Sequence, residues 1–229
     1  LLGITKEQFL KKMKKAAQAP NAPTVESIFE KQLSPKEYAA IQERLYRFKG
    51  FSVQSRTLRK YPKPIAAHTL GYLGEADERT TQKDAYYKEG DYLGVTGIEK
   101  TYEKVLRGKK GIRIIMVDKF NRENGSYMDG IYDTAAVPGK PLTTTIDRDL
   151  QEYGEQLMQN KIGSVVALDP QTGEILAIVT SPTYDPNLLV GRVRNKNIGL
   201  LLQDTLGNPL FNRSTMASYP PGSTFKLLM

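Results

Sequence analysis

The sequence predicts an α+β fold, and three observations lead to that class. Apolar residues recur with helical spacing in several stretches, and other stretches combine β-branched residues with turn signals such as Pro-x-x-Gly. Around residue 150 a predicted helix is followed directly by a predicted antiparallel hairpin, which suits the opening of an α+β domain. The length of 229 residues and the hydrophobic content of 39% are those of a globular chain with one large or two small domains.

The first half of the chain is predicted to contain three helices and two short strands. Thr5 can cap the first helix, and prolines at positions 20 and 23 end it. Ser34 followed by Pro35 is a cap with proline at the first helical position, and Gly108 closes the third helix. The helices are expected at residues 4–19, 34–48 and 97–106, the strands at 51–54 and 112–117, and a hairpin or loop at 121–133.

The second half is predicted to open with a strand at 142–146, which is rich in threonine. Asp147 can cap a helix that runs to about residue 160. Strands at 164–168 and 174–179 are expected to pair across a turn at Pro170–Gly173.

The pattern changes at Val137-Pro138-Gly139-Lys140, so we place a domain boundary between residues 139 and 140. Charge changes there as well, because residues 1–140 carry 26 Lys and Arg against 17 Asp and Glu, whereas residues 141–229 carry 7 against 8. A basic surface can serve nucleic acid, an anionic membrane or an anionic polymer. The simpler interpretation is a set of solvated helix faces.

Composition excludes several kinds of site. The chain has no cysteine, so disulfides and thiolate metal sites are excluded within it. His68 is its one histidine, and a lone histidine is more often packed than catalytic. We expect no metal and no cofactor. No run of 18 apolar residues and no signal peptide is visible. Because the chain starts at Leu1 and ends in an apolar run, we expect a fragment with both flanks missing.

The stretch Tyr219-Pro-Pro-Gly-Ser-Thr-Phe-Lys226 carries the strongest chemical signal. Its prolines and glycine turn the chain, so Ser223 is expected to begin a helix whose free backbone N–H groups can stabilise an oxyanion. Residues three apart share a helix face, so Lys226 Nζ can reach Ser223 Oγ. A serine hydroxyl needs such a base, and lysine can serve when burial or nearby cations lower its pKa. A surface helix turn is the alternative interpretation of a bare Ser-x-x-Lys.

Further informative segments are spread over residues 50–229. They are Arg59–Pro62, Ala66–Tyr72, Gly94–Glu99, Tyr102–Gly108, Val137–Leu142, Thr145–Gln151, Gly163–Asn187 and Asn208–Arg213. Together with Ser-x-x-Lys, these segments resemble the penicillin-binding proteins, in particular the monofunctional (class B) peptidoglycan D,D-transpeptidases and among those the elongation type.

The resemblance implies a non-catalytic pedestal, or dimerisation, domain at residues 1–139. It is followed at 140–229 by the start of a transpeptidase domain of the serine β-lactamase-like kind, truncated just after Ser-x-x-Lys. In this family the serine, here Ser223, is acylated by a stem peptide ending in D-Ala-D-Ala, and the lysine, here Lys226, is the general base. A neighbouring stem then forms the cross-link, and β-lactams acylate the same serine. The Ser-x-Asn and Lys-Thr-Gly motifs are not found after Ser223, so the fragment itself is expected to be inactive.

The resemblance also implies partners and a location. The expected partners are peptidoglycan stem peptides, β-lactam antibiotics, a polytopic glycosyltransferase and scaffold proteins of the elongation machinery, but no nucleic acid. A single-pass anchor in the inner membrane is expected upstream of Leu1, with the ectodomain in the periplasm. Alternatives remain open: a septal-type transpeptidase, a pedestal or scaffold module without activity, a β-lactam sensor or class D β-lactamase, and a D,D-carboxypeptidase, whose activity can also be a side reaction.

Overall fold

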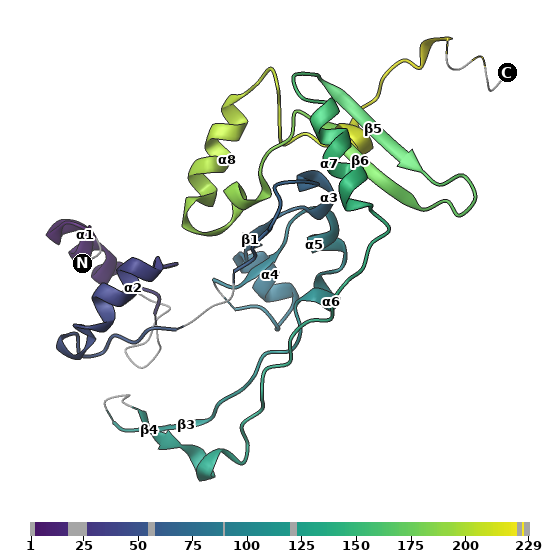
Figure 1. Ribbon diagram of the computed structural model, residues 1–229. Helices are drawn as coiled ribbons and strands as arrows, with labels where there is room; N and C mark the ends of the chain where they lie inside the picture. Colours follow the sequence, from purple (N-terminus) through teal and green to yellow (C-terminus); the bar gives the residue numbers. More distant parts are fainter. Residues whose placement is uncertain are drawn as a thin grey trace. The chain divides into compact units, whose positions relative to one another are not determined.

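The computed structural model describes residues 3–17, 27–54, 58–88, 90–119, 123–223 and 226. The chain divides into two compact units, and Figure 1 labels the helices and strands that belong to them. The first unit consists of Leu1–Thr57 with Lys109–Val137, and the second of Leu58–Gly108 with Pro138–Met229. Each unit mixes helices with two-stranded antiparallel sheets, so the predicted α+β class is confirmed.

The helices of the first unit begin where their capping residues predict. α1 (Lys6–Ala17) follows Thr5, whose hydroxyl accepts a hydrogen bond from the Gln8 N–H at 3.3 Å. α2 (Pro35–Gln42) follows Ser34, whose side chain and that of Glu37 cap each other's backbone N–H groups. α2 ends before the predicted residue 48, and the 3-10 turn η1 (Leu45–Arg47) follows. The prolines expected to end the first helix lie outside the described residues.

Four phenylalanine rings form the centre of the helical part of the first unit. Phe29 lies 5.1 Å from Phe9 and 5.3 Å from Phe51, and Phe51 lies 6.2 Å from Phe48, measured between ring centroids. The strand predicted at 51–54 is wrong, because these residues form no ladder. The side chain of Phe51 instead joins the aromatic cluster, which gives it apolar contacts without strand pairing.

The other part of the first unit is a hairpin. β3 (Ile115–Val117) pairs antiparallel with β4 (Glu123–Ser126), and the 3-10 turn η2 (Tyr127–Gly130) follows. The strand predicted at 112–117 is therefore confirmed only in its second half. Ile112, three residues before β3, instead makes an isolated bridge with Thr134.

The second unit begins with short elements around one small sheet. β1 (Leu73–Glu75) pairs antiparallel with β2 (Tyr92–Gly94). The helices are α3 (Ala67–Leu70), α4 (Glu78–Lys83), α5 (Gly97–Thr101) and α6 (Glu103–Leu106). The helix predicted at 97–106 is thus divided at Tyr102, whose φ of −104° and ψ of 18° are not helical.

A helix packed on a hairpin follows in the second unit, as predicted. Asp147 caps α7 (Arg148–Leu157), and β5 (Gly163–Leu168) pairs antiparallel with β6 (Ile175–Ser181). α7 lies against β6, and Gly154 allows this approach, because a Cβ there would lie 2.8 Å from Val179 Cγ2. Val179 is 1% exposed and so belongs to the core under α7.

The strand predicted at 142–146 is wrong. The threonine-rich residues there form no ladder, and single hydrogen bonds replace it. The Thr145 hydroxyl donates to the Ile175 carbonyl at 2.8 Å, and the Asp147 N–H donates to the Leu176 carbonyl at 2.8 Å. These two hydrogen bonds attach the segment to the start of β6 before the chain enters α7.

The last elements of the second unit are η3 (Pro186–Leu189), η4 (Gly191–Val193), α8 (Arg194–Gln203) and α9 (Arg213–Met216). Ala67, Tyr184 and Leu189 form a core cluster, in which Ala67 comes from the first stretch of the unit and the other two from the second. The two stretches therefore share one apolar core.

The compact units do not follow the predicted division at residues 139 and 140. Gly139 lies directly against α6, since a Cβ on it would lie 1.9 Å from the Leu106 carbonyl oxygen, and the Lys140 N–H donates to the Val105 carbonyl at 2.9 Å. Compactness and functional domains are different properties, so the boundary between a pedestal at 1–139 and a transpeptidase domain at 140–229 stays a prediction.

Candidate functional site

The predicted nucleophile and base lie near the end of the chain. Gly222 has a φ of +62°, which glycine adopts without strain, and Ser223 and Lys226 lie in 3-10 turns. The side chains of Ser223 and Lys226 are both exposed, and no hydrogen bond joins them within the described residues. Thr224, Phe225 and residues 227–229 lie outside those residues. The pairing of Ser223 with Lys226 stays a prediction.

The segment that leads to Ser223 is attached to the end of β6. Thr180, which is 4% exposed, accepts a hydrogen bond from the Ser214 N–H at 3.3 Å, and its hydroxyl lies 3.2 Å from Asn212 Oδ1. The Ser214 hydroxyl donates to the same amide oxygen at 2.6 Å. α9 also packs on β5 and β6. The last described helix before Ser223 thus has a fixed place on the hairpin.

Gln151 is a polar residue in the middle of the second unit. It is 1% exposed, and its amide makes a reciprocal pair with the backbone of Ile178 on β6, donating at 2.7 Å and accepting at 2.8 Å. The same amide nitrogen lies 2.8 Å from Glu155 Oε1, which also accepts from the Ala66 N–H at 2.7 Å. One chain of hydrogen bonds therefore joins β6, α7 and the stretch before α3.

Replacing Gln151 with leucine is expected to lower the free energy of unfolding by about 2–4 kcal/mol, because it leaves the buried N–H and carbonyl groups of Ile178 without partners. Gln156→Leu, at an exposed position of the same helix, is the matched control and should change it by less than about 0.5 kcal/mol. Urea unfolding followed by circular dichroism measures both. Equal effects of the two substitutions would contradict the structural role of Gln151.

The Arg59–Pro62 segment is held between α5 and η3. Arg59 makes a two-point ion pair with Glu99, at 2.9 Å and 3.0 Å, and Glu99 is 7% exposed. Asn187 pairs with the backbone of Tyr61 in both directions, at 3.0 Å and 2.9 Å. Burial, followed by the Glu99 charge, raises the pKa of Tyr61 to about 12. The segment is therefore attached on two sides, to Glu99 of α5 and to Asn187 of η3, and each donor in these contacts has an acceptor.

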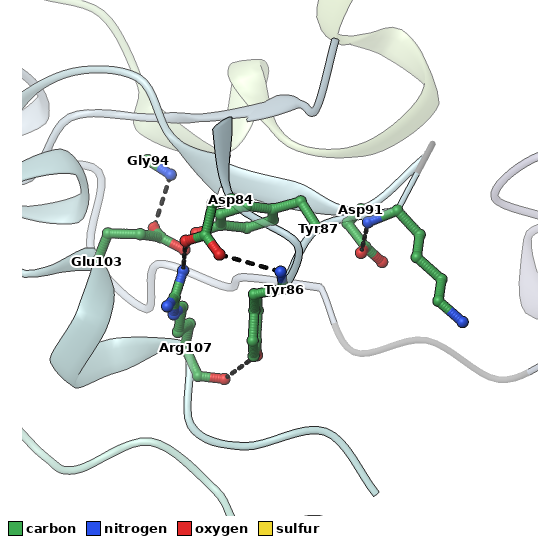
Figure 2. Close-up of polar contacts among 8 residues, drawn as sticks. Asp84, Tyr86, Tyr87, Asp91, Gly94, Glu103 and Arg107 are labelled. Carbon is green, nitrogen blue, oxygen red and sulfur yellow. Dashed lines mark hydrogen bonds and ion pairs between the residues drawn. The ribbon is translucent and has the colours of Figure 1, made fainter. Parts of the chain in front are cut away.

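A second polar cluster surrounds the end of α6 (Figure 2). Arg107 makes an ion pair with Asp84 at 2.7 Å, and its guanidinium lies 4.0 Å from the centroid of the Tyr86 ring. The hydrogen bond from Arg107 holds the pKa of Asp84 below its usual range. Tyr87 donates to Glu103 at 2.8 Å, and burial is the main cause that raises its pKa to about 12. Because these side chains pair with one another, we interpret the cluster as one that stabilises the fold.

The structure also places Asp147 and His68, which the sequence singled out, and two further aspartates. Asp147 caps α7, as predicted. Asp149 pairs with Arg148 at 2.9 Å, and Asp169 accepts from the Gln171 N–H in the β5–β6 turn at 2.8 Å. His68 packs edge-on against the Tyr184 ring, with centroids 5.3 Å apart, in a part-buried position.

The stability of the fold is expected to depend on pH through His68. Burial is the main cause that lowers the pKa of His68 from 6.5, and the Arg213 charge acts in the same direction, against the carbonyls of Pro209 and Pro182. The unfolded chain therefore takes up the proton first as pH falls. We expect stability to decrease from pH 6.5 down to the lower folded pKa of His68 and to lose nothing more from this group below it.

This dependence is measured by the difference in unfolding free energy between the wild type and His68→Gln at several pH values. The neutral glutamine removes the titration, so the wild type should lose more stability than the variant across that window. Parallel curves for the two proteins would contradict the prediction.

The described residues offer neither a cluster of metal ligands nor a helix that could span a membrane. They hold no group of three or more histidine, cysteine, aspartate or glutamate side chains that could bind a metal ion. Within the same residues, the helices are all too short or too polar to cross a membrane.

Comparison with known proteins identifies the family. The family model of the penicillin-binding protein dimerisation domain matches residues 1–144, and that of the penicillin-binding protein transpeptidase domain matches residues 163–229. The chain belongs to the penicillin-binding proteins. The second match contains Ser223 and Lys226 and the anchored segment before them.

The relatives indicate the subtype. Peptidoglycan D,D-transpeptidase MrdA of Acinetobacter baumannii is 33% identical over 85% of this chain and 29% of its own length. The protein of the same name from Escherichia coli K12 is 36% identical over 79% of this chain and 29% of its own length. The chain thus spans about three tenths of the length of these relatives.

Solved structures agree with this. PBP2 of Helicobacter pylori, in a complex with MreC, has a TM-score of 0.68 and 29% identity over 98% of this chain and 45% of its own. PBP2 of Pseudomonas aeruginosa, in complex with WCK 5153, has a TM-score of 0.60 and 34% identity over 76% of this chain and 34% of its own. The resemblance predicted from the motifs, including its closeness to the elongation type, is confirmed.

Proposed function

We propose that the chain is part of an elongation-type peptidoglycan D,D-transpeptidase that works through an acyl-enzyme on Ser223. The observation that carries this proposal is the Ser-x-x-Lys motif inside the part of the chain that matches the transpeptidase family. A serine hydroxyl attacks the carbonyl of the penultimate D-Ala, its proton passes to Lys226, and the terminal D-Ala leaves. An amine of a second stem peptide then attacks the ester and releases Ser223. Attack by water instead gives a D,D-carboxypeptidase side reaction.

The fragment by itself is proposed to be inactive. Its β5–β6 hairpin leaves apolar side chains on both faces exposed, with Val165 at 47%, Val166 at 46% and Leu168 at 57%. α7 covers β6, where Val179 is 1% exposed, but these apolar side chains of β5 are left uncovered, and exposed apolar patches mark surfaces that another segment covers. This exposure supports the idea that segments of the longer protein cover the hairpin and complete the site around Ser223.

The proposal extends to partners and location. The H. pylori structure is a complex of PBP2 with MreC, which supports a scaffold partner of that kind for this protein. The names of the two families support β-lactams as ligands of Ser223. A polytopic glycosyltransferase as a further partner, and an inner-membrane anchor with a periplasmic ectodomain, are part of the same proposal.

The test is mass spectrometry of the full-length protein after exposure to a labelled penicillin. Proteolysis should give one adduct, on the peptide that contains Ser223. A folded full-length protein that carries no adduct, or carries it on another residue, would overturn the proposal.

A further inference from the structure

Arg213 is a buried cation for which the structure shows no acidic partner. The residue is 7% exposed, and its guanidinium makes no ion pair with any carboxylate of the described residues. Burying a charge costs several kcal/mol unless hydrogen bonds replace its hydration. A neutral side chain would avoid that cost. We therefore ask which hydrogen bonds the guanidinium donates at this position.

The guanidinium is surrounded by backbone carbonyls of a single turn. Arg213 donates to the carbonyls of Gly207 at 2.5 Å and Asn208 at 3.2 Å, with a longer contact to Phe211 at 3.5 Å. The Phe211 ring centroid lies 5.6 Å from the guanidinium carbon. A planar group with five N–H donors can serve several carbonyls at once, which no neutral side chain can do.

The turn itself is shaped to present these carbonyls. The Asp204 carboxylate accepts from the Gly207 N–H at 2.7 Å, and a Cβ on Gly207 would lie 2.4 Å from that carboxylate. Asn208 has a φ of +44°, in the left-handed region that asparagine tolerates better than most residues. Both features direct the carbonyls of residues 207 and 208 toward Arg213.

Arg213 is also the first residue of α9, and α9 is held on its other side by β6. The Thr180 hydroxyl accepts from the Ser214 N–H and lies beside Asn212. The turn at 204–211 and the strand β6 thus hold α9 from two sides. Met216 ends α9, and six residues, two of them prolines, separate it from Ser223. This connection limits Ser223 to within about 25 Å of the end of α9, and the two prolines restrict its conformations.

We propose that Arg213 is a positioning residue for Ser223: by tying the turn at 204–211 to α9, it fixes the point from which the nucleophile-bearing segment starts. This inference rests on the proposed function. A displacement of about 1 Å in a reacting group can cost on the order of a hundredfold in rate. Loss of Arg213 therefore reduces the rate of acylation while penicillin still binds to the site.

The experiment measures acylation of the full-length enzyme by a fluorescent penicillin in stopped flow, which separates the noncovalent dissociation constant from the acylation rate constant. Arg213→Met keeps the length of the side chain but removes its donors, and it should lower the rate constant by about tenfold to a hundredfold with less than a threefold change in the dissociation constant. Arg213→Lys, which retains three donors, should recover part of the loss.

Arg194→Met is the matched control, because Arg194 lies over the Tyr72 ring in the same unit, 5.4 Å from its centroid, and makes no described contact with residues 204–216. It should leave the acylation rate constant unchanged. If Arg213→Met does not fold, Arg213→Lys and Thr180→Val each weaken one of the two attachments of α9 and should lower the same rate constant.

Different results would overturn the proposed function and the positioning role of Arg213. A wild-type enzyme that is not acylated on Ser223 overturns the proposed function. A wild type that is acylated, with folded Arg213 variants that lose thermal stability but keep the wild-type acylation rate constant, overturns the positioning role alone.

Discussion

Replacing Ser223 with alanine in the full-length enzyme is expected to abolish acylation by penicillin, because alanine has no group that can form the ester. Lys226→Met should lower the acylation rate constant by at least about 10³-fold, since the hydroxyl then lacks the base that takes its proton. Both variants should unfold at the wild-type temperature within a few degrees, because neither side chain makes a hydrogen bond or ion pair within the described residues. Gel fluorescence after timed exposure to a fluorescent penicillin measures the two rates.

The matched controls are Ser164→Ala on β5 and Lys196→Met on α8, which are exposed positions of the same unit. Both should keep wild-type labelling. Labelling of Ser223→Ala at the wild-type rate would place the nucleophile elsewhere. A wild-type rate in Lys226→Met would remove this lysine from the role of base and leave Ser223 in place.

Local patterns in the sequence predicted those features of the fold whose causes are local. Ser34 and Asp147 cap helices because their side chains reach backbone N–H groups two or three residues away. The β5–β6 hairpin follows from two β-branched runs around one turn. The strands predicted at 51–54 and 142–146 failed for the opposite reason: strand propensity needs a partner strand, and neither segment has one.

The supports of the candidate site could not be predicted from local patterns, because they join residues far apart in the sequence. Tyr61 and Asn187 are 126 positions apart, and Ala66 and Glu155 are 89 apart. The sequence placed Gln151 on a predicted helix, but nothing in the sequence indicated that its polar side chain faces the core, where it is 1% exposed. Arg213 lay within a segment that resembles the family, yet its burial depends on the turn at 204–211. The Ser223–Lys226 pair, by contrast, was predicted from neighbouring residues alone, and it stays a prediction.

The same long-range contacts predict how the chain folds when it is cut. A version of the full-length protein that begins at residue 140 loses the stretch 58–108 and is expected not to form a stable fold. The cut exposes the core around Tyr184 and Leu189, and it leaves Gln151 and Asn187 without part of their hydrogen-bond network. Each buried polar group left without a partner costs about 1–3 kcal/mol, and an ordinary domain is stabilised by only about 5–15 kcal/mol, so losing several such contacts removes much of that stability.

A second truncated version of the full-length protein serves as the control. It begins at residue 58 and has a short Gly-Ser linker in place of residues 109–137. The linker can be short because Gly139 lies against Leu106 and the Lys140 N–H bonds to Val105, so the chain leaves and re-enters the second unit at neighbouring points. This protein should be soluble, unfold in one cooperative transition and be labelled by penicillin. Circular dichroism and a thermal melt of the two proteins decide the matter. If the version beginning at residue 140 melts cooperatively at the same temperature, the stretch 58–108 is an attachment to the transpeptidase domain; if it does not, that stretch is part of the domain's own core.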